Sequence, residues 1–275
     1  MFFNTMKNII LLLFAVIMLS SCSQYQKVLS SDDTGKKYAL ADSLYAQGKY
    51  KKALKLFEQI VPVYRGKPQA ERLMFLYANT FYELEDYYLS GYQFERFETS
   101  YPQSDSVEVA AYKSAKSYSE LSPRYSLDQE DTYKALEKLQ SYINKYPNSE
   151  KRTEANELVS ELSGKIEKKD IEIANQNLKI AEYIGDYRPA IESYDNFISD
   201  HPGSVYRKDA FFGRLQAAYE LAVRSVPSLV EERLITAQDY YNKFNKYYSD
   251  TDLKAEADLI AQNIAERLGE REQKS

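Results

Sequence analysis

The sequence predicts an all-α protein, a stack of about five helical hairpins with one further helix capping the C-terminal end. Three observations lead to this prediction: a spacing pattern that recurs along the chain, a small residue at one fixed place in each copy, and similar proline-containing junctions after several copies. The 275 residues are 44% hydrophobic and include 26 Tyr and 12 Phe, which supplies a sizeable core. Because the chain has a single cysteine, packing rather than disulfides must hold this core.

The recurring pattern is clearest in the copy that starts at Ala78. Glu85 lies seven residues further on, and the second half of the copy follows at Tyr87, Ser90, Phe94, Phe97 and Pro102. The same steps recur from Ala41 and from Leu178 with glycine at the seventh place, and weaker copies at 135–147 and 237–249 keep the second half. Steps of three and four put these residues on one helix face, and the glycine or acidic residue marks the turn between two helices.

Small residues and proline junctions support the same interpretation. A small side chain lets paired helices approach closely, and it recurs at equivalent places: Ala53, Ser90, Ala135, Ala190 and Ala237. The junctions read Tyr-Pro-Gln-Ser at 101–104, Tyr-Pro-Asn-Ser at 146–149 and His-Pro-Gly-Ser at 201–204. We expect the proline to end one helix and the serine to cap the next.

Several stretches lie outside the regular pattern. Insertions at 122–129 and 223–230 are expected to lengthen the turns inside their hairpins. Residues 149–184 have a helical pattern apart from Gly164, which predicts one long or kinked helix. After Asp250 an amphipathic stripe predicts the capping helix, and the tail at 269–275 is expected to fray; the stripe is Leu253, Ala257, Ile260, Ile264 and Leu268.

A helical hairpin that recurs at about 34 residues resembles the tetratricopeptide repeat. This resemblance implies a right-handed superhelical solenoid, in which each unit buries its apolar face on its neighbours. We expect it to form a single domain over residues 36–268.

The N-terminal segment has the form of a targeting sequence. Residues 9–19 are eleven apolar residues in a row, which suits a signal peptide and falls short of the roughly 20 that span a bilayer. The sequence Leu19-Ser20-Ser21-Cys22 resembles the lipobox of bacterial lipoproteins. The resemblance implies removal of residues 1–21, with S-diacylglycerol and N-acyl chains such as palmitate on Cys22, and residues 22–35 as a lipidated tether. The alternative is a secretory signal cut elsewhere, with Cys22 an incidental thiol.

Charge and motifs exclude several function classes. The formal net charge is -5 and basic and acidic residues are mixed along the chain, so we expect no nucleic-acid partner. The one histidine, His201, lies in a junction where other copies have tyrosine, and no His/Cys cluster could hold a metal. Asp33-Thr34-Gly35 matches the aspartic-protease tripeptide, but it occurs once and precedes a helix. We therefore expect a binding protein, not an enzyme, without metal or cofactor.

The lipobox, the repeats and the junctions together resemble the BamD (ComL) family of outer-membrane lipoproteins, most clearly over 45–57, 94–104 and 146–174. The resemblance implies a lipid-anchored, periplasm-facing scaffold of the outer-membrane β-barrel assembly machinery. Its front repeats are expected to receive unfolded barrel proteins, and its rear repeats to dock a POTRA domain of a BamA-type insertase. Ser23 after Cys22, in place of Asp, also favours the outer membrane by resemblance to the enterobacterial sorting rule.

Two alternative functions share much of this evidence. One is a periplasmic repeat adaptor for cell-wall or other envelope enzymes, which has the same fold. The other resembles SusD, a glycan-binding lipoprotein, which is normally about twice as long and carries tryptophan platforms. This chain has no Trp, which counts against the second alternative.

Candidate binding residues follow from the expected repeat geometry, in which the first helix of each hairpin lines the concave surface. The polar and aromatic residues beside the packing stripe are expected to form a peptide groove: Tyr38, Asp42, Tyr45, Phe75, Asn79 and Tyr82. The alternative is that these tyrosines complete the packing between units. Related repeats that grip a peptide carboxylate carry Lys and Asn where this chain has Tyr38 and Asp42, so a clamp of that form is not expected. For insertase docking the resemblance indicates Lys165 on the long helix, which is otherwise an ordinary solvated lysine.

Overall fold

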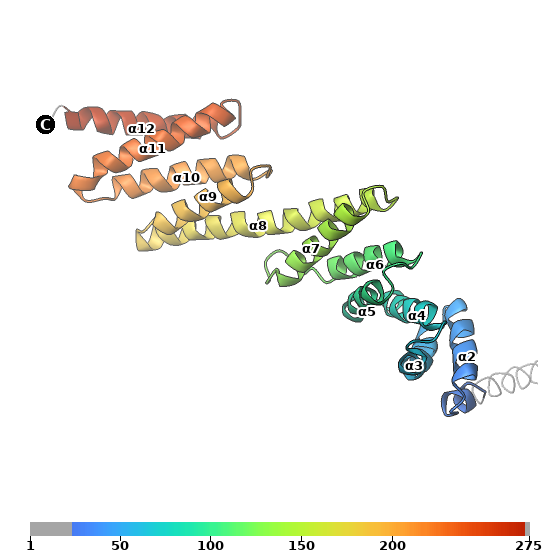
Figure 1. The fold of residues 1–275 in the computed structure, drawn as a ribbon. Coiled ribbons are helices and arrows are strands. Elements are labelled where there is room, and N and C mark those ends of the chain that lie inside the picture. Colours follow the sequence, from blue (N-terminus) through green and yellow to red (C-terminus); the bar gives the residue numbers. More distant parts are fainter. Residues whose placement is uncertain (1–23, 273–275) are drawn as a thin grey trace, which may run out of the picture. The chain divides into compact units, whose positions relative to one another are not determined.

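The computed structural model describes residues 24–272, and every regular element in that range is a helix (Figure 1). These residues divide into two compact units. The N-terminal unit holds the described residues up to Ser122 together with Glu130–Val159, and the C-terminal unit holds Pro123–Gln129 and the chain from Ser160 onward. The single solenoid domain expected over 36–268 is therefore described below as two units.

The N-terminal unit contains three of the expected hairpins. Helices α2 (Thr34–Ala46) and α3 (Tyr50–Ile60) form the first, which a short 3-10 helix η1 (Val61–Tyr64) follows. Helices α4 (Ala70–Glu83) and α5 (Tyr87–Ser100) form the second, and α6 (Val107–Glu120) and α7 (Glu130–Lys145) the third. Each helix packs on the one after it, from α2 through to α7, so this unit is a continuous stack of hairpins.

The C-terminal unit contains the remaining two hairpins and the cap. Its first hairpin pairs the later part of α8 (Arg152–Ile184) with α9 (Arg188–Asp200), and its second pairs α10 (Arg207–Val223) with α11 (Pro227–Tyr248). Helix α12 (Lys254–Glu272) covers α10 and α11. The all-α fold, the five hairpins and the capping helix are thus confirmed.

The small residues at the repeated place are buried without exception. The relative exposure of Ala53, Ser90, Ala135, Ala190 and Ala237 is 0% in each case. At the second hairpin Ser90 Oγ lies 2.9 Å from Ser117 Oγ, so two small hydroxyl side chains pair where α5 meets α6. Small side chains at these places therefore lie buried between closely packed helices, as predicted.

The hairpin turns use a left-handed backbone at the residue seven after the start of each strong copy. Gly48 has φ 70°, Gly185 has φ 75°, and Glu85 has φ 60°. Among the described residues Glu85 is the one non-glycine residue with positive φ. The repeat thus imposes the same turn on a residue whose Cβ disfavours it.

Replacing Glu85 by glycine should stabilise the fold. The left-handed conformation costs a non-glycine residue about 1–2 kcal/mol. Glycine avoids this cost, but it loses more backbone entropy on folding, which offsets about 0.5–1 kcal/mol of the gain in stability. We expect Glu85→Gly to raise the free energy of unfolding by about 0.5–1 kcal/mol, measured by urea denaturation. The matched change Gly48→Glu should lower it by a similar amount, and a loss of stability in Glu85→Gly would contradict this account.

The proline junctions differ slightly from expectation. Helix α5 ends at Ser100, just before Pro102, but α6 begins at Val107 and not directly after Ser104. Ser104 Oγ instead accepts the backbone N–H of Ser106 at 3.1 Å, and Ser149 and Ser204 do the same for the residues two further on. The serines thus cap the junction turn rather than the helix itself.

Four other predictions about helices and loops can be compared with this structure. The insertion at 122–129 is a loop, and α8 is one helix of 33 residues with Gly164 inside it, both as expected. The insertion at 223–230 lengthens α11 rather than the turn, since that helix already begins at Pro227. The tail expected to fray from 269 remains helical to Glu272.

The described chain begins folded, not as a free tether. Residues 24–29 are helical, and Tyr25, Val28 and Leu29 pack against the core of the first hairpin. The Tyr25 hydroxyl donates to the backbone carbonyl of Lys52 at 3.2 Å. The segment expected to tether the fold thus contacts the first hairpin through Tyr25, Val28 and Leu29.

Candidate functional site

The predicted groove residues lie on α2 and α4, the first helices of two successive hairpins. Asn79 Nδ2 donates to the hydroxyl of Tyr45, 34 residues earlier in the chain. Lys113 Nζ on α6, a further 34 residues on, donates to Asn79 Oδ1. These three equivalent positions form an inter-repeat ladder, the name used below for Tyr45, Asn79 and Lys113.

A second contact of the same spacing involves Arg72. Its Nη1 donates to the hydroxyl of Tyr38 at 3.1 Å, and its Nη2 lies 2.7 Å from Asp42 Oδ1. These interactions raise the pKa of Arg72, first through the hydrogen bond to Asp42. Tyr38 also stacks on Tyr64, with ring centroids 5.5 Å apart. The sequence analysis missed Arg72, although its distance of 34 residues from Tyr38 is the repeat length.

Two of the predicted residues are more enclosed than a groove lining requires. Phe75 contacts Phe94 and Phe97 edge to face, with centroids 5.7 and 5.5 Å apart, so it packs within its own hairpin. Asn79 is 5% exposed, and its amide is already bonded to Tyr45, Glu83 and Lys113. Asn79 therefore makes contacts between units, whereas the ring contacts of Phe75 lie inside its own hairpin.

A pocket of about 240 Å³ opens beside the predicted residue Tyr82. Helices α4, α6 and α7 and the end of the α7–α8 connection supply its lining, which combines tyrosines and lysines around one exposed aliphatic side chain: Tyr82, Glu108, Val109, Tyr112, Lys113, Lys116, Tyr142 and Lys151. We call this the Tyr/Lys pocket. Its volume lies below the about 300–1,000 Å³ typical of small-molecule sites, which suits a single inserted side chain.

The lysines of the Tyr/Lys pocket are held in place by aromatic rings and one carboxylate. Lys113 Nζ lies 4.5 Å from the ring centroid of Tyr82. Glu154 accepts from Lys116 at 2.6 Å and from Lys151 at 3.1 Å. The hydrogen bond from Lys116, followed by the effect of the neighbouring Tyr112 hydroxyl, lowers the pKa of Glu154 to about 2, so this carboxylate stays ionised at neutral pH.

Burial shifts the other titratable groups of the pocket. It raises the pKa of the Tyr112 hydroxyl, and the neighbouring Glu154 carboxylate adds to the rise. Burial also lowers the pKa of Lys113, against the opposing effect of Glu83. The pocket therefore presents neutral phenols and partly desolvated ammonium groups, which suits a ligand with both aromatic and polar atoms.

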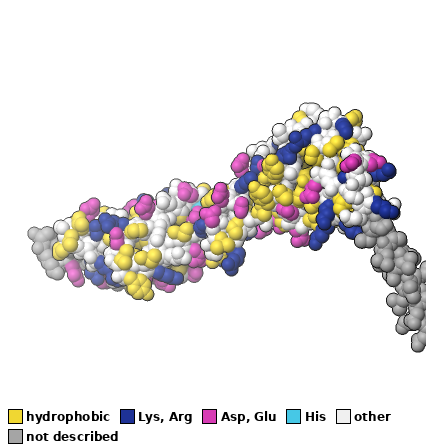
Figure 2. Space-filling view, turned by 90° about the horizontal axis from the view of Figure 1, so that it is seen from below, with side chains coloured by type: hydrophobic (Ala, Val, Ile, Leu, Met, Phe, Trp, Pro, Cys, Tyr) yellow, Lys and Arg dark blue, Asp and Glu magenta, His cyan; other side chains and the backbone are white. Residues whose placement is uncertain are grey.

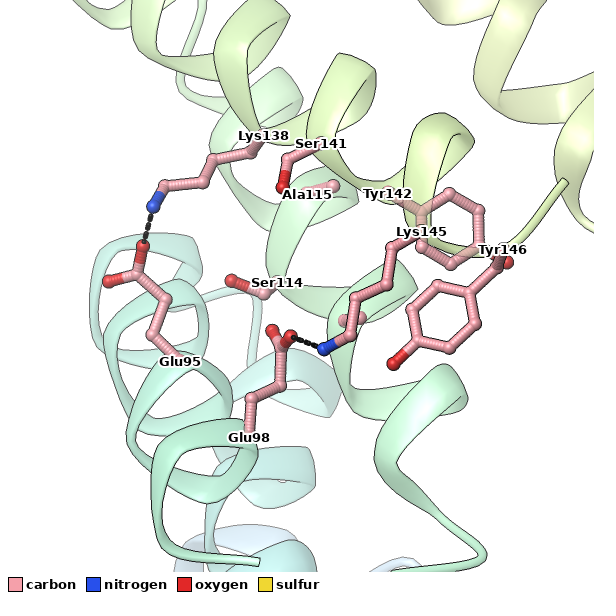
Figure 3. Close-up of a pocket in the computed structure, with 10 residues that line it drawn as sticks. Glu95, Glu98, Ser114, Ala115, Lys138, Ser141, Tyr142, Lys145 and Tyr146 are labelled. Carbon is pink, nitrogen blue, oxygen red and sulfur yellow. Dashed lines mark ion pairs between the residues drawn. The ribbon is translucent and has the colours of Figure 1, made fainter. Parts of the chain in front are cut away.

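A second cavity of the N-terminal unit lies among α5, α6 and α7 and is smaller, at about 90 Å³ (Figure 3). Two ion pairs cross it: Lys138 Nζ lies 2.5 Å from Glu95 and Lys145 Nζ lies 3.6 Å from Glu98. Burial raises the pKa of Glu98. Because its charges are paired across the two hairpins, this cavity joins helices and offers little to a ligand.

The residues considered for catalysis, Asp33 and His201, make contacts that support the fold. Asp33 caps α2 by accepting the backbone N–H of Lys36 at 3.0 Å, as a loop and cap residue would. His201 Nε2 lies 2.9 Å from Asp170 Oδ2, and the His201 ring is 4.9 Å from that of Phe197. Within residues 24–272 no group of three His, Cys, Asp or Glu side chains could hold a metal ion.

Two predicted residues remain, Lys165 and Cys22, and the structure describes the first of them. Lys165 belongs to α8 in the C-terminal unit, is partly buried, and lies 3.5 Å from Glu161 one turn earlier. Cys22 lies outside the described residues. Among the described helices, none is long and apolar enough to cross a bilayer.

Comparison with known proteins identifies one family. YfiO, described as "Outer membrane lipoprotein", matches residues 31–226. Among solved structures, the yeast Sti1 TPR2AB domain in complex with pHSP90 is 12% identical, covering 84% of this chain and 98% of that one at a TM-score of 0.37. TPR-like repeats of a kinesin-light-chain-type protein from Podosopora anserina are 12% identical, covering 81% and 99% at a TM-score of 0.35. No curated protein matches the chain.

Proposed function

Since the chain belongs to the YfiO (BamD) family of outer membrane lipoproteins, we propose that it is a non-catalytic scaffold of the machinery that assembles β-barrel proteins in the outer membrane. In this proposal Cys22 carries the acyl chains and the scaffold faces the periplasm. The N-terminal unit binds unfolded barrel precursors, and the C-terminal unit docks a POTRA domain of a BamA-type insertase through α8, including Lys165.

The Tyr/Lys pocket is the observation that supports precursor binding. Barrel strands alternate apolar and polar side chains and are rich in aromatic residues near the membrane interfaces. An extended segment of such a strand can place one aromatic side chain among Tyr82, Tyr112 and Val109, while Lys113 and Lys116 meet polar or acidic neighbours on the segment. Arg72 and Tyr38 extend a polar surface along the first helices of the same stack.

The proposal is tested by the proteins that accompany this chain in the cell. Tagged protein extracted in mild detergent should co-purify with a POTRA-bearing insertase, and depletion should lower the levels of outer-membrane barrel proteins. Recovery of cell-wall enzymes with unchanged barrel levels would instead favour the adaptor alternative, which shares the fold.

The proposed lipid anchor is tested separately by Cys22→Ala. Attachment to the membrane raises the effective concentration of the scaffold at the insertase, so the variant should weaken barrel assembly. Circular dichroism should show an unchanged fold, because Cys22 precedes the packed residues. Full complementation by a soluble periplasmic form would show that the anchor is dispensable.

A further inference from the structure

The end of the chain that would carry the anchor is strongly basic, although the whole chain is acidic. Residues 24–67 contain nine Lys and Arg against four Asp and Glu, whereas the formal net charge of all 275 residues is -5. In Figure 2 several Lys and Arg side chains lie at the right-hand end, where Figure 1 places α2 and α3. A charge of one sign confined to one end indicates a partner of the opposite sign.

Five exposed lysines form the centre of this charge, and we call them the basic face: Lys27, Lys49, Lys51, Lys52 and Lys55. Lys51, Lys52 and Lys55 share one side of α3, with Glu58 as the acidic residue on that side. The ion pairs found among residues 24–272 involve none of the five. Their charge is therefore not neutralised within the protein.

The packing of Tyr25 brings the chain start to this face. Its hydroxyl bonds to the Lys52 carbonyl, and Lys52 Nζ lies 5.4 Å from the centre of its ring. Cys22 precedes Tyr25 by three residues, which span at most about 11 Å even when fully extended. Acyl chains on Cys22 would therefore enter the membrane beside the basic face.

We propose that the basic face binds the anionic headgroups of membrane phospholipids and forms a second attachment beside the lipid anchor. Each lysine near an anionic membrane surface adds to binding, and such a patch commonly completes an anchor made of acyl chains. The attachment also fixes which side of α3 faces the membrane. The placement of the membrane beside this face rests on the proposed lipidation of Cys22, whereas the charge and exposure of the lysines do not.

The test uses protein that has no acyl chains, so that the face acts alone. The chain from residue 22 onward carrying Cys22→Ser should co-sediment with phosphatidylcholine vesicles that contain phosphatidylglycerol, and not with vesicles of phosphatidylcholine only. Changing Lys27, Lys51 and Lys55 to Gln should weaken this binding about a hundredfold, or about fivefold for each lysine. High salt should weaken it as well.

A matched control separates the basic face from net charge. Changing Lys179, Lys243 and Lys246 of the C-terminal unit to Gln removes the same charge from exposed positions and should leave vesicle binding unchanged. Equal binding to both vesicle types, equal loss in both triple variants, or equally tight binding of inorganic phosphate would overturn the proposal. Failure of insertase co-purification with vesicle binding intact would count against the proposed function alone.

Discussion

Val109→Glu is expected to weaken the binding of barrel-precursor segments by about tenfold to a hundredfold. Val109 is 47% exposed and is the aliphatic member of the Tyr/Lys pocket. A carboxylate there would lie near Glu108 and would have to be desolvated by an incoming aromatic side chain, and a buried group left unpaired costs about 1–3 kcal/mol. The affinity for a labelled synthetic strand segment, measured by fluorescence anisotropy, reports this loss.

The variant should leave the fold intact, which makes the measurement interpretable. Val109 lies in the first turn of α6, where a negative charge is favourable because of the helix dipole. Val205→Glu is the matched control, because Val205 is 81% exposed and precedes α10 in the C-terminal unit. Equal affinities in the two variants would place precursor binding outside the Tyr/Lys pocket.

Gly213→Ala is expected to lower the free energy of unfolding by about 2 kcal/mol. A Cβ at Gly213 would lie 2.6 Å from the hydroxyl oxygen of Tyr194 and 2.8 Å from its Cε1. Tyr194 is 1% exposed and donates to Asn175 at 2.8 Å, so moving its ring away would disturb a buried contact and this hydrogen bond. Overpacking of this kind costs about 1–3 kcal/mol or more, and the better helix propensity of alanine returns about 1 kcal/mol.

Gly164→Ala provides the comparison for that prediction. Gly164 lies within α8, and apart from its chain neighbours and the backbone of the same helix no atom lies within 4 Å of a Cβ added there. This variant should gain up to about 1 kcal/mol from helix propensity alone. Urea denaturation followed by far-UV circular dichroism gives both values. Similar stabilities of the two variants would show that the α9–α10 contact tolerates an added methyl group.

The hairpins could be predicted from sequence because their evidence is local. Steps of three and four, the glycine at turns such as Gly48, and buried small residues such as Ala190 each constrain one helix or one turn. The start of α11 was also readable, since Pro227 is the type of residue that favours the first turn of a helix. The longer turn predicted there from the insertion neglects this signal.

The candidate site was harder to predict because its members meet across repeats. The position beside the packing stripe on a first helix predicts Tyr45 and Tyr82, but the predicted set does not include Arg72 and Lys113, whose charged groups reach the neighbouring hairpin. The same period applied to polar residues links Tyr38 to Arg72 and Asn79 to Lys113. The Tyr/Lys pocket still could not be found completely in this way, because Lys151 joins it from outside the 34-residue spacing.

The inter-repeat ladder has a consequence for how the N-terminal unit opens. Nearest-neighbour stacks can fray from an end, one repeat at a time, when the interfaces are weak. Here Asn79 is bonded to both Tyr45 and Lys113, so detaching α2 also removes one hydrogen bond from the amide of this α4 residue. Fraying of the first hairpin therefore also destabilises the second, and a force on the N-terminal end of the described chain acts on three hairpins together. Slow amide hydrogen exchange should accordingly extend together across α2, α4 and α6.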